Sequence, residues 1–323
     1  MSTVLLPPAA RGVASVAPGV RLVAALGLVL ALWSVAYAPT LAAMAHVWLT
    51  SDTYAHGALI APLAGWLLYR QRAALAAAPL ARAPAALPGL VLAGSLWAAA
   101  TLATIDVLAQ LAVVLLLVTA AWFLVGTGWL RVAWFPCAFL LLAVPLGDGL
   151  TPTLIGHTAD FVVFALRLVG VPVFREGSFF VIPTGSWSVV TGCSGMRYLM
   201  ATLTVAALFA HLNYRAAWKQ ALFVLVALAV ALVANWLRAF GIVMIAHLSD
   251  MRLALGVDHY LYGWVFFGII VCLLMLLGER WREVMPVPGA PPPLCGQPPG
   301  AGSVLLVLAL LAAWPLALRA TTG

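Results

Sequence analysis

The chain has 323 residues, of which 65% are hydrophobic and 8% are charged, and its mean hydropathy is +1.11. Soluble domains are about half apolar and about a quarter charged, so this composition excludes an ordinary water-soluble enzyme and indicates a membrane protein. The net charge of +7 comes from basic residues scattered between apolar runs, which argues against a nucleic-acid partner. The four cysteines form no C-x-x-C pair, which argues against a zinc or iron–sulfur site, and we expect no metal or other cofactor.

Nine apolar stretches approach the length of about 20 residues that a membrane-spanning helix needs. In chain order they are residues 21–38, 55–69, 87–104, 107–125, 132–147, 189–210, 220–246, 257–278 and 302–318. The second and fifth are short. Together they predict an all-α fold, a polytopic helical bundle in a lipid bilayer, with about eight core spans and one appended span.

Composition divides the chain into four segments. These are an N-terminal cytoplasmic tail (1–20), a transmembrane domain (21–280), a cytoplasmic linker (281–301) and a C-terminal transmembrane helix (302–323). The linker contains PVPGAPPPLCGQPP, which is typical of a stiff polyproline-like segment. We also expect residues 148–188 to form a long loop, because they contain several prolines and glycines, with an apolar stretch at 179–182 that dips into the membrane interface.

The orientation follows from the basic residues of the short loops, which mark the cytoplasmic side. With nine spans all of these residues fall on one side: Arg11, Arg21, Arg70, Arg72, Arg82, Arg131, Arg215, Lys219, Arg280 and Arg282. Seven acidic residues fall on the other: Asp52, Asp106, Asp148, Asp160, Glu176, Asp250 and Asp258. We therefore predict a cytoplasmic N-terminus and an extracytoplasmic C-terminus.

The run VVTGCSGMRYLM (189–200) opens the sixth span on the outer side and contains Cys193 between Gly192 and Ser194-Gly195. The glycines leave the backbone accessible, and a thiol at a helix N-terminus meets the free N–H groups and the dipole that favour the reactive thiolate. The other cysteines fall in the inner halves of their spans or in the linker. The alternative is that Cys193 is a small buried residue, as free cysteines often are.

The seventh span contains ANWLRAF, in which Asn235 and Arg238 are three residues apart and share a helix face. Arg238 follows Lys219 by 19 residues, about 28 Å of helix, which places it at the outer edge of a hydrocarbon core about 30 Å thick. The alternative is an arginine that extends to the outer lipid headgroups.

The eighth span opens on the outer side with GVDHYLYGW, which contains Asp258 and His259. Taken alone, this histidine could be an interfacial anchor beside the tyrosines and the tryptophan. The topology, however, brings Cys193, Arg238 and His259 to one depth on one side of the membrane. These are the groups that cysteine acyl transfer needs: a nucleophile, a cation for the oxyanion and a proton donor for the leaving amine.

Four blocks carry a resemblance to a known family: SDTYAHG (51–57), TGCSGMRYL (191–199), ANWLRA (234–239) and GVDHYLYGW (256–264). They resemble the exosortases, and most closely the A-type members. The resemblance implies a multi-pass enzyme of the bacterial inner membrane whose active site faces the periplasm. It implies a cysteine transpeptidase or protease that cleaves membrane-anchored proteins at a C-terminal signal of a Pro-Glu-Pro motif, a membrane helix and a basic cluster.

The cysteine, arginine and histidine of the family match Cys193, Arg238 and His259. Where the family usually has an acidic residue and an alanine before the cysteine, this chain has Thr191-Gly192. If that acidic residue sets a protonation state in the family, this chain does so by other means or works less well. The family is also often encoded beside exopolysaccharide genes.

Further polar residues are candidates for substrate binding, namely Arg197, Asn235, Asp258 and His56. Arg197 lies one turn after Cys193 and could share the oxyanion or bind a carboxylate. His56 follows Asp52 by four residues and could equally be an interface anchor. His247, at the outer end of the seventh span, is a rival to His259 as the acid–base group.

Two other functions compete with this interpretation. A transporter or polysaccharide carrier predicts ionisable residues near the bilayer midplane, and the central spans carry almost none. A polytopic glycosyltransferase of exopolysaccharide export requires a catalytic carboxylate at the outer face, for which Asp52, Asp148 and Asp258 are the candidates.

Overall fold

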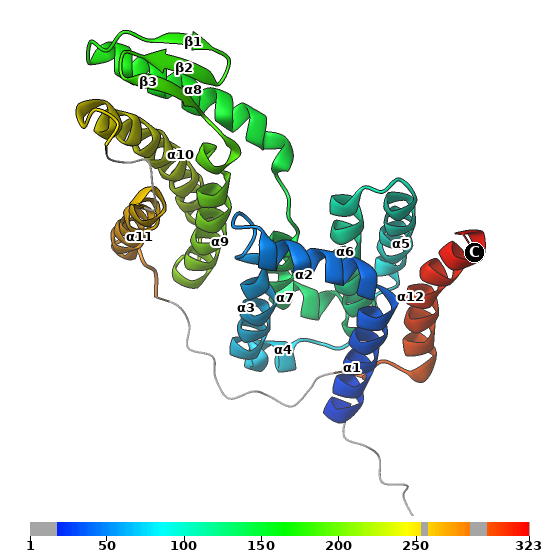
Figure 1. Cartoon of the computed structure of the whole chain (residues 1–323). Helices are drawn as coiled ribbons and strands as arrows, with labels where there is room; N and C mark the ends of the chain where they lie inside the picture. The colour runs from blue at the N-terminus through cyan, green and yellow to red at the C-terminus, as the bar shows by residue number, and fades with distance from the viewer. Residues whose placement is uncertain (1–17, 253–257, 285–295, 323) are drawn as a thin grey trace, which may run out of the picture. The chain divides into compact units, whose positions relative to one another are not determined.

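The computed structural model describes residues 18–252, 258–284 and 296–322, and for residues 18, 258–262, 264, 321 and 322 it describes the backbone alone. Within these residues the chain forms twelve α-helices and a three-stranded sheet (Figure 1). The helices are α1 (Pro18–Ala36), α2 (Ala38–Thr50), α3 (Gly57–Arg70), α4 (Arg72–Ala77), α5 (Leu87–Leu102), α6 (Asp106–Val125), α7 (Thr127–Phe139), α8 (Thr151–Leu168), α9 (Met196–Asn213), α10 (Ala217–Leu248), α11 (Asp258–Glu279) and α12 (Ala301–Thr322). The strands are β1 (Phe174–Glu176), β2 (Phe179–Ile182) and β3 (Gly185–Ser188).

Seven helical segments of the described residues are long and apolar enough to cross a membrane. They are Gly19–Ala36, Pro84–Leu102, Asp106–Val125, Asp148–Leu168, Thr191–Asn213, Ala217–Leu248 and Ala301–Ala320. Two shorter apolar helices are Thr127–Ala143 and Val265–Glu279. Along α10, large apolar side chains stand exposed from Leu222 to Ile245, a surface that suits lipid rather than water. The predicted all-α, polytopic membrane protein is confirmed.

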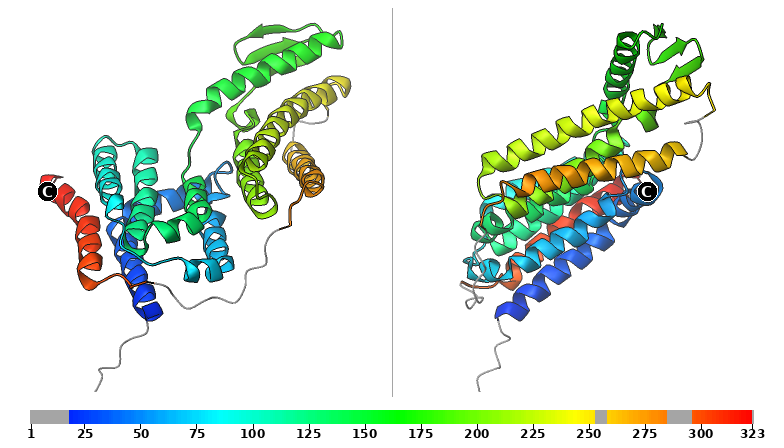
Figure 2. Two further views of the ribbon diagram at one scale, coloured as in Figure 1. Left: turned by 180° about the vertical axis from the view of Figure 1, so that it is seen from behind. Right: turned by 90° about the vertical axis from the view of Figure 1, so that its left-hand side faces the viewer.

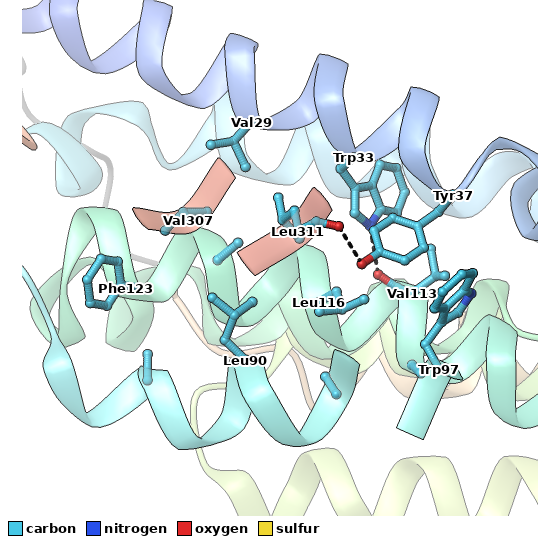
Figure 3. Close-up of a cluster of buried hydrophobic side chains, with 14 of the residues drawn as sticks. Val29, Trp33, Tyr37, Leu90, Trp97, Val113, Leu116, Phe123, Val307 and Leu311 are labelled. Atoms are coloured by element: carbon cyan, nitrogen blue, oxygen red, sulfur yellow. Dashed lines mark hydrogen bonds between the residues drawn. The ribbon is translucent and has the colours of Figure 1, made fainter. Parts of the chain in front are cut away.

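The described residues pack as two units. The first comprises the described residues of 18–41, 68–134 and 296–322, and its core joins α1, α5, α6 and α12 (Figure 3). In that core the indole N–H of Trp33 donates to the Val113 carbonyl (2.9 Å), and the Tyr37 hydroxyl donates to the Leu311 carbonyl (3.0 Å). These bonds satisfy the polar atoms of two large buried rings, so the aromatic side chains fill the core without leaving a donor unpaired.

The C-terminal helix α12 packs within the core of the first unit. Its Val307 and Leu311 are fully buried, and it contacts α1, α5 and α6. On α5, a β-carbon at Gly94 would lie 1.9 Å from the Trp314 indole nitrogen, so the absence of a side chain there admits that ring. The linker before this helix predicts an appended span, but linker composition carries no information about the face that a following helix buries.

The second unit comprises the described residues of 42–67, 135–252 and 258–284, and it is organised around α10. This helix has 32 residues, about 48 Å of length, and it contacts α8, α9 and α11 (Figures 1 and 2). Near its start, Phe223 and Ala227 share a core with the end of α9 and with Leu274 of α11. Near its end, Val243 shares a different core with α8 and the sheet. One long helix therefore links two separate packing layers.

Residues 148–188 are more regular than the loop expected for them. They form α8 and then an antiparallel sheet in the order β1-β2-β3, with Phe180 opposite both Arg175 and Trp187. Phe180 and Ile182 are buried against Val162 and other apolar residues of α8. The expectation of a loop was wrong because α8 mixes threonine, histidine, aspartate and arginine with its apolar residues, which makes it the least hydrophobic of the seven candidate spans.

The start of α10 and the residues after α11 are held together by Glu283. Its carboxylate accepts hydrogen bonds from the backbone N–H groups of Arg215 (2.6 Å) and Ala216 (3.3 Å) and from Lys219 Nζ (2.5 Å). The Lys219 hydrogen bond, supported by these backbone donors, lowers the pKa of Glu283 from its usual 4.5 to about 2. The negative charge sits where a helix N-terminus favours it, and it fixes the level of α11 against α10.

Candidate functional site

Cys193 is the last residue of a 3-10 turn, Thr191–Cys193, that precedes α9. The helix itself begins at Met196, whose N–H donates to Ser194 Oγ (3.2 Å), and the thiol-bearing residue is half-buried. The sequence analysis places Cys193 at the helix start, whereas the structure places it in a turn ahead of the helix. The reason is Gly195, whose φ of +89° is a left-handed conformation that interrupts the helical path.

Asn235 holds this turn from α10. Its side-chain Nδ2 donates to the Cys193 carbonyl oxygen (3.0 Å) and approaches Thr158 Oγ1 of α8 at 3.5 Å. Asn235 is 1% exposed, and Thr158 is fully buried. Because a carbonyl oxygen can only accept, the bond requires the amide nitrogen to face Cys193. One buried side chain therefore joins the Cys193 turn, α10 and α8.

Gly195 is required at its position for two independent reasons. Its positive φ is a backbone conformation that residues with a β-carbon adopt at a cost. A β-carbon there would also lie 2.7 Å from Asn235 Nδ2 and 2.8 Å from Asn235 Cγ. The second glycine of the TGCSG run thus allows the chain to turn and allows Asn235 to reach the carbonyl of Cys193.

The Arg238 side chain extends from α10 and contacts residues of α9 and α11. Its guanidinium carbon is 5.3 Å from the ring centroid of Tyr198, a cation–π distance, and Tyr198 stacks on Phe267 of α11. A β-carbon at Gly263 of α11 would lie 2.7 Å from the Tyr198 hydroxyl and 3.0 Å from Arg238 Nε. The Nε and Nη1 atoms are inaccessible to solvent. These contacts favour a site residue over an arginine that extends to the headgroups.

His259 and Asp258 lie in the first turn of α11, and their side chains are outside the described part of the chain. His259 precedes Gly263 by four residues, about one helical turn, so its backbone is near the level at which α11 meets Arg238. The structure thus places the helix that carries His259 beside Arg238. The meeting of the three side chains Cys193, Arg238 and His259 stays a prediction.

The N-terminal block SDTYAHG is bound to the same region. Asp52 Oδ2 accepts a hydrogen bond from Arg197 Nη2 of α9 (2.6 Å). The Tyr54 hydroxyl donates to Asp148 Oδ1 (2.7 Å), and burial together with that carboxylate raises the pKa of Tyr54. In this structure Arg197, expected to bind substrate, therefore carries an ion pair that ties residues 51–57 to α9, and Asp52 pairs with Arg197 rather than with His56.

His56 lines a groove of about 470 Å³ between residues 52–59, α9 and α11. Arg197 and Tyr198 border the groove with it, and Ala201 and Phe267 give it apolar walls. Since Tyr198 also contacts Arg238, the groove and the arginine share one wall.

His247, the rival acid–base candidate, is engaged with the sheet. Its Nδ1 shares a hydrogen bond with Thr184 Oγ1, between β2 and β3, at 2.8 Å. Val243 and Met244, one turn before it on α10, belong to the same apolar cluster as Cys193. Both His247 and His259 therefore stay candidates for the acid–base group.

Sequence reasoning missed several residues of this region. Thr158 falls in the segment treated as a loop, and nothing in its neighbourhood marks it. Tyr198 and Gly263 belong to the TGCSGMRYL and GVDHYLYGW blocks, but a tyrosine or a glycine at those positions predicts no particular role. The detectable signal was Gly195: a second glycine two residues after a cysteine, directly before a helix, indicates a close backbone approach.

A comparison with protein families matches the description "Transmembrane exosortase" over residues 48–276. This match covers more than half of the chain and includes the four blocks that carry the resemblance. The chain belongs to the transmembrane exosortase family. Comparisons with curated proteins and with solved structures give no significant match.

The family match assigns this exosortase to a class of membrane proteins that are, in general, cysteine transpeptidases or proteases that process sorting signals. The matched segment contains all of α3 to α10 and most of α11, while α1 and α12 lie outside it. Cys193, Asn235, Arg238 and Gly263 all fall within the match. The residues that the structure gathers around the Cys193 turn are thus residues of the exosortase region itself.

Substituting Gly195 with alanine tests the turn of this exosortase. We expect Gly195→Ala to destabilise the protein by about 1–2 kcal/mol from the left-handed backbone alone, with a further cost from the clash with Asn235. Gly192→Ala is the matched control, because a β-carbon there meets nothing within 4 Å, and it should change stability by less than about 0.5 kcal/mol. Thermal unfolding in detergent measures both, and equal midpoints for the two variants would contradict the assignment.

Proposed function

We propose that this exosortase is an A-type member that cleaves membrane-anchored proteins at a C-terminal Pro-Glu-Pro sorting signal. The observation that carries the proposal is the family match over the Cys193 turn, together with a buried asparagine and an enclosed arginine on the adjacent helix. Placing polar side chains around a cysteine at the end of a membrane helix costs free energy, and a catalytic role explains that cost best.

In the proposed reaction the Cys193 thiolate attacks the carbonyl carbon of the scissile peptide bond. Arg238 stabilises the resulting oxyanion, and His259 gives a proton to the leaving amine as the C–N bond breaks. This yields a thioester between the substrate and Cys193. An acceptor nucleophile then attacks the thioester carbonyl, loses its proton to His259 and releases Cys193 as thiolate. Water as acceptor gives hydrolysis, whereas an amine gives transpeptidation.

The competing functions are weakened by contacts of the described residues. Asp52 is bound by Arg197 and Asp148 by Tyr54, so two of the three carboxylates that a glycosyltransferase could use are already engaged. Between Lys219 and Arg238, α10 carries no ionisable side chain. A transporter with a central ion path would place such groups near the midplane of its longest helix.

Replacing the proposed nucleophile is the direct test. We expect Cys193→Ala to abolish processing of a substrate with a Pro-Glu-Pro signal while the protein still folds and inserts, because the loss of one sulfur atom from a half-buried side chain costs little packing. Cys272→Ala, on the exposed side of α11, should keep wild-type activity. Immunoblotting of precursor and mature substrate in cells measures both. Wild-type processing by Cys193→Ala would exclude the covalent mechanism.

The sidedness of the site has its own test. We propose an inner-membrane location with Cys193 facing the periplasm, and we expect a membrane-impermeant maleimide to label Cys193 in intact spheroplasts. In variants that retain a single cysteine, Cys137, Cys272 and Cys295 should not react from that side. Labelling of Cys193 in inside-out vesicles but not in spheroplasts would reverse the predicted topology.

Arg238→Lys separates an oxyanion site from a headgroup anchor. A headgroup anchor needs only a positive charge, whereas an oxyanion site needs the planar donors of a guanidinium. We expect turnover to fall by a factor on the order of 10²–10³, the scale seen when one oxyanion donor is removed, with unchanged insertion.

Arg197→Lys is the control for that substitution, because lysine can keep an ion pair with Asp52. It should retain most of the activity, since exposed ion pairs contribute about 0–1 kcal/mol. Normal turnover by Arg238→Lys together with an inactive Arg197→Lys would move the oxyanion role to Arg197.

A further inference from the structure

The Cys193 turn is a 3-10 turn ahead of α9, so its backbone lies outside the regular hydrogen bonding of an α-helix. It opens a segment, Thr191–Asn213, that is long and apolar enough to cross a membrane. Irregular backbone in such a segment is tolerated where it is buried in protein or lines a water-filled cavity. The Cys193 carbonyl has its donor from the protein, because Asn235 Nδ2 of α10 binds it at 3.0 Å.

The amide of Asn235 is buried at a cost. The residue is 1% exposed, and among the described residues its Oδ1 has no hydrogen-bond partner. An apolar side chain at this position would carry no unsatisfied oxygen, so burial alone does not explain an asparagine here. What the amide supplies, and leucine does not, is the bond from Nδ2 to Cys193.

We propose that Asn235 is a positioning residue that orients Cys193 through its main-chain carbonyl, in place of the substrate-binding role expected from the sequence. The bond runs to the carbonyl of the residue that carries the thiol, so it sets the orientation of the Cα–Cβ bond of Cys193. Gly195 admits the amide by lacking a β-carbon, and Thr158 contacts the same nitrogen from α8. The expected effect on turnover rests on the proposed function. The expected effect on the reactivity of the thiol rests on the hydrogen bond between Asn235 and Cys193 alone.

The test uses Asn235→Asp, which keeps the size of the side chain, and Asn235→Leu, which keeps its branching but removes the donor, in the full-length protein with Cys193 as its single cysteine. An ionised carboxylate cannot donate to the Cys193 carbonyl and repels it, whereas a protonated carboxyl group can donate. Burial raises the pKa of such a carboxyl group into an accessible range. We therefore expect Asn235→Asp to lose about 10- to 100-fold in kcat at pH 8, with KM within about twofold, and to recover relative to wild type as the pH falls to 5.

Asn235→Leu has no donor at any pH, so its loss should not recover. Asn213→Asp is the matched control, because Asn213 Nδ2 also donates to a backbone carbonyl, that of Phe209 (2.9 Å), at the far end of α9. It should leave kcat unchanged at both pH values. If Asn235→Leu fails to fold, Asn235→Asp still decides the matter, since one preparation is compared with itself at two pH values.

Alkylation of Cys193 by iodoacetamide provides a readout that needs no substrate. The ratio of the Asn235→Asp rate to the wild-type rate should depart from one at pH 8 and return towards one at pH 5. This trend would hold even if Cys193→Ala proved active, which would refute the proposed function alone. Ratios of kcat and of alkylation that do not change with pH, or wild-type turnover by Asn235→Leu, would overturn the positioning role.

Discussion

A peptide carbonyl that is shielded from water needs a donor from the protein, and the bond that Asn235 gives to Cys193 organises the residues around it. α-Helices satisfy their carbonyls by their own hydrogen bonds, whereas the turn ahead of α9 relies on a side chain of the neighbouring helix. Here the chain leaves the helical path at Gly195, and the freed carbonyl of Cys193 is taken up by the Asn235 amide from the neighbouring helix. The turn around Cys193 therefore carries little side-chain bulk, and the Cys193 carbonyl is still hydrogen-bonded.

The two units of the described chain differ in how they accommodate polar groups. The first is closed by aromatic rings whose polar atoms bind backbone carbonyls, as Trp33 and Tyr37 do. The second places the polar side chains of Asn235 and Arg238 between helices and adds an ion pair of Arg197 with the exposed Asp52. All of these lie inside the segment that matches the exosortase family, so the cost of enclosing Asn235 and Arg238 falls within the family region.

Much of this organisation could be predicted from the sequence, because lipid imposes a uniform rule on spanning helices. Long apolar stretches such as those of α5, α6 and α10 were predicted within a few residues, and the match to the exosortase family agrees with the blocks around Cys193, Arg238 and His259. The helix α8 and its sheet were not predicted, because half-apolar elements do not follow the rule for uniform spans.

The local site was less predictable than the fold. That Asn235 and Arg238 share a face follows from helical spacing, but the partner of each depends on tertiary packing. Asn235 binds the Cys193 carbonyl, Arg197 binds Asp52, and Thr158 arrives from a segment treated as a loop. Helical periodicity predicts which residues of one helix share a face. It does not predict which neighbouring helix packs on that face.

The length of α10 has a mechanical consequence. A helix of about 48 Å exceeds a hydrocarbon core of about 30 Å, and even at a tilt of 40° its projection on the membrane normal is about 37 Å. Part of α10 therefore stands outside the acyl chains at any ordinary tilt. The last third of α10 packs against α8 and the sheet, and its middle is hydrogen-bonded to the Cys193 turn through Asn235. A shift of α10 caused by hydrophobic mismatch would therefore carry α8, the sheet and the Cys193 turn with it. Bilayer thickness thereby becomes a variable that sets the height of the thiol relative to the lipid surface.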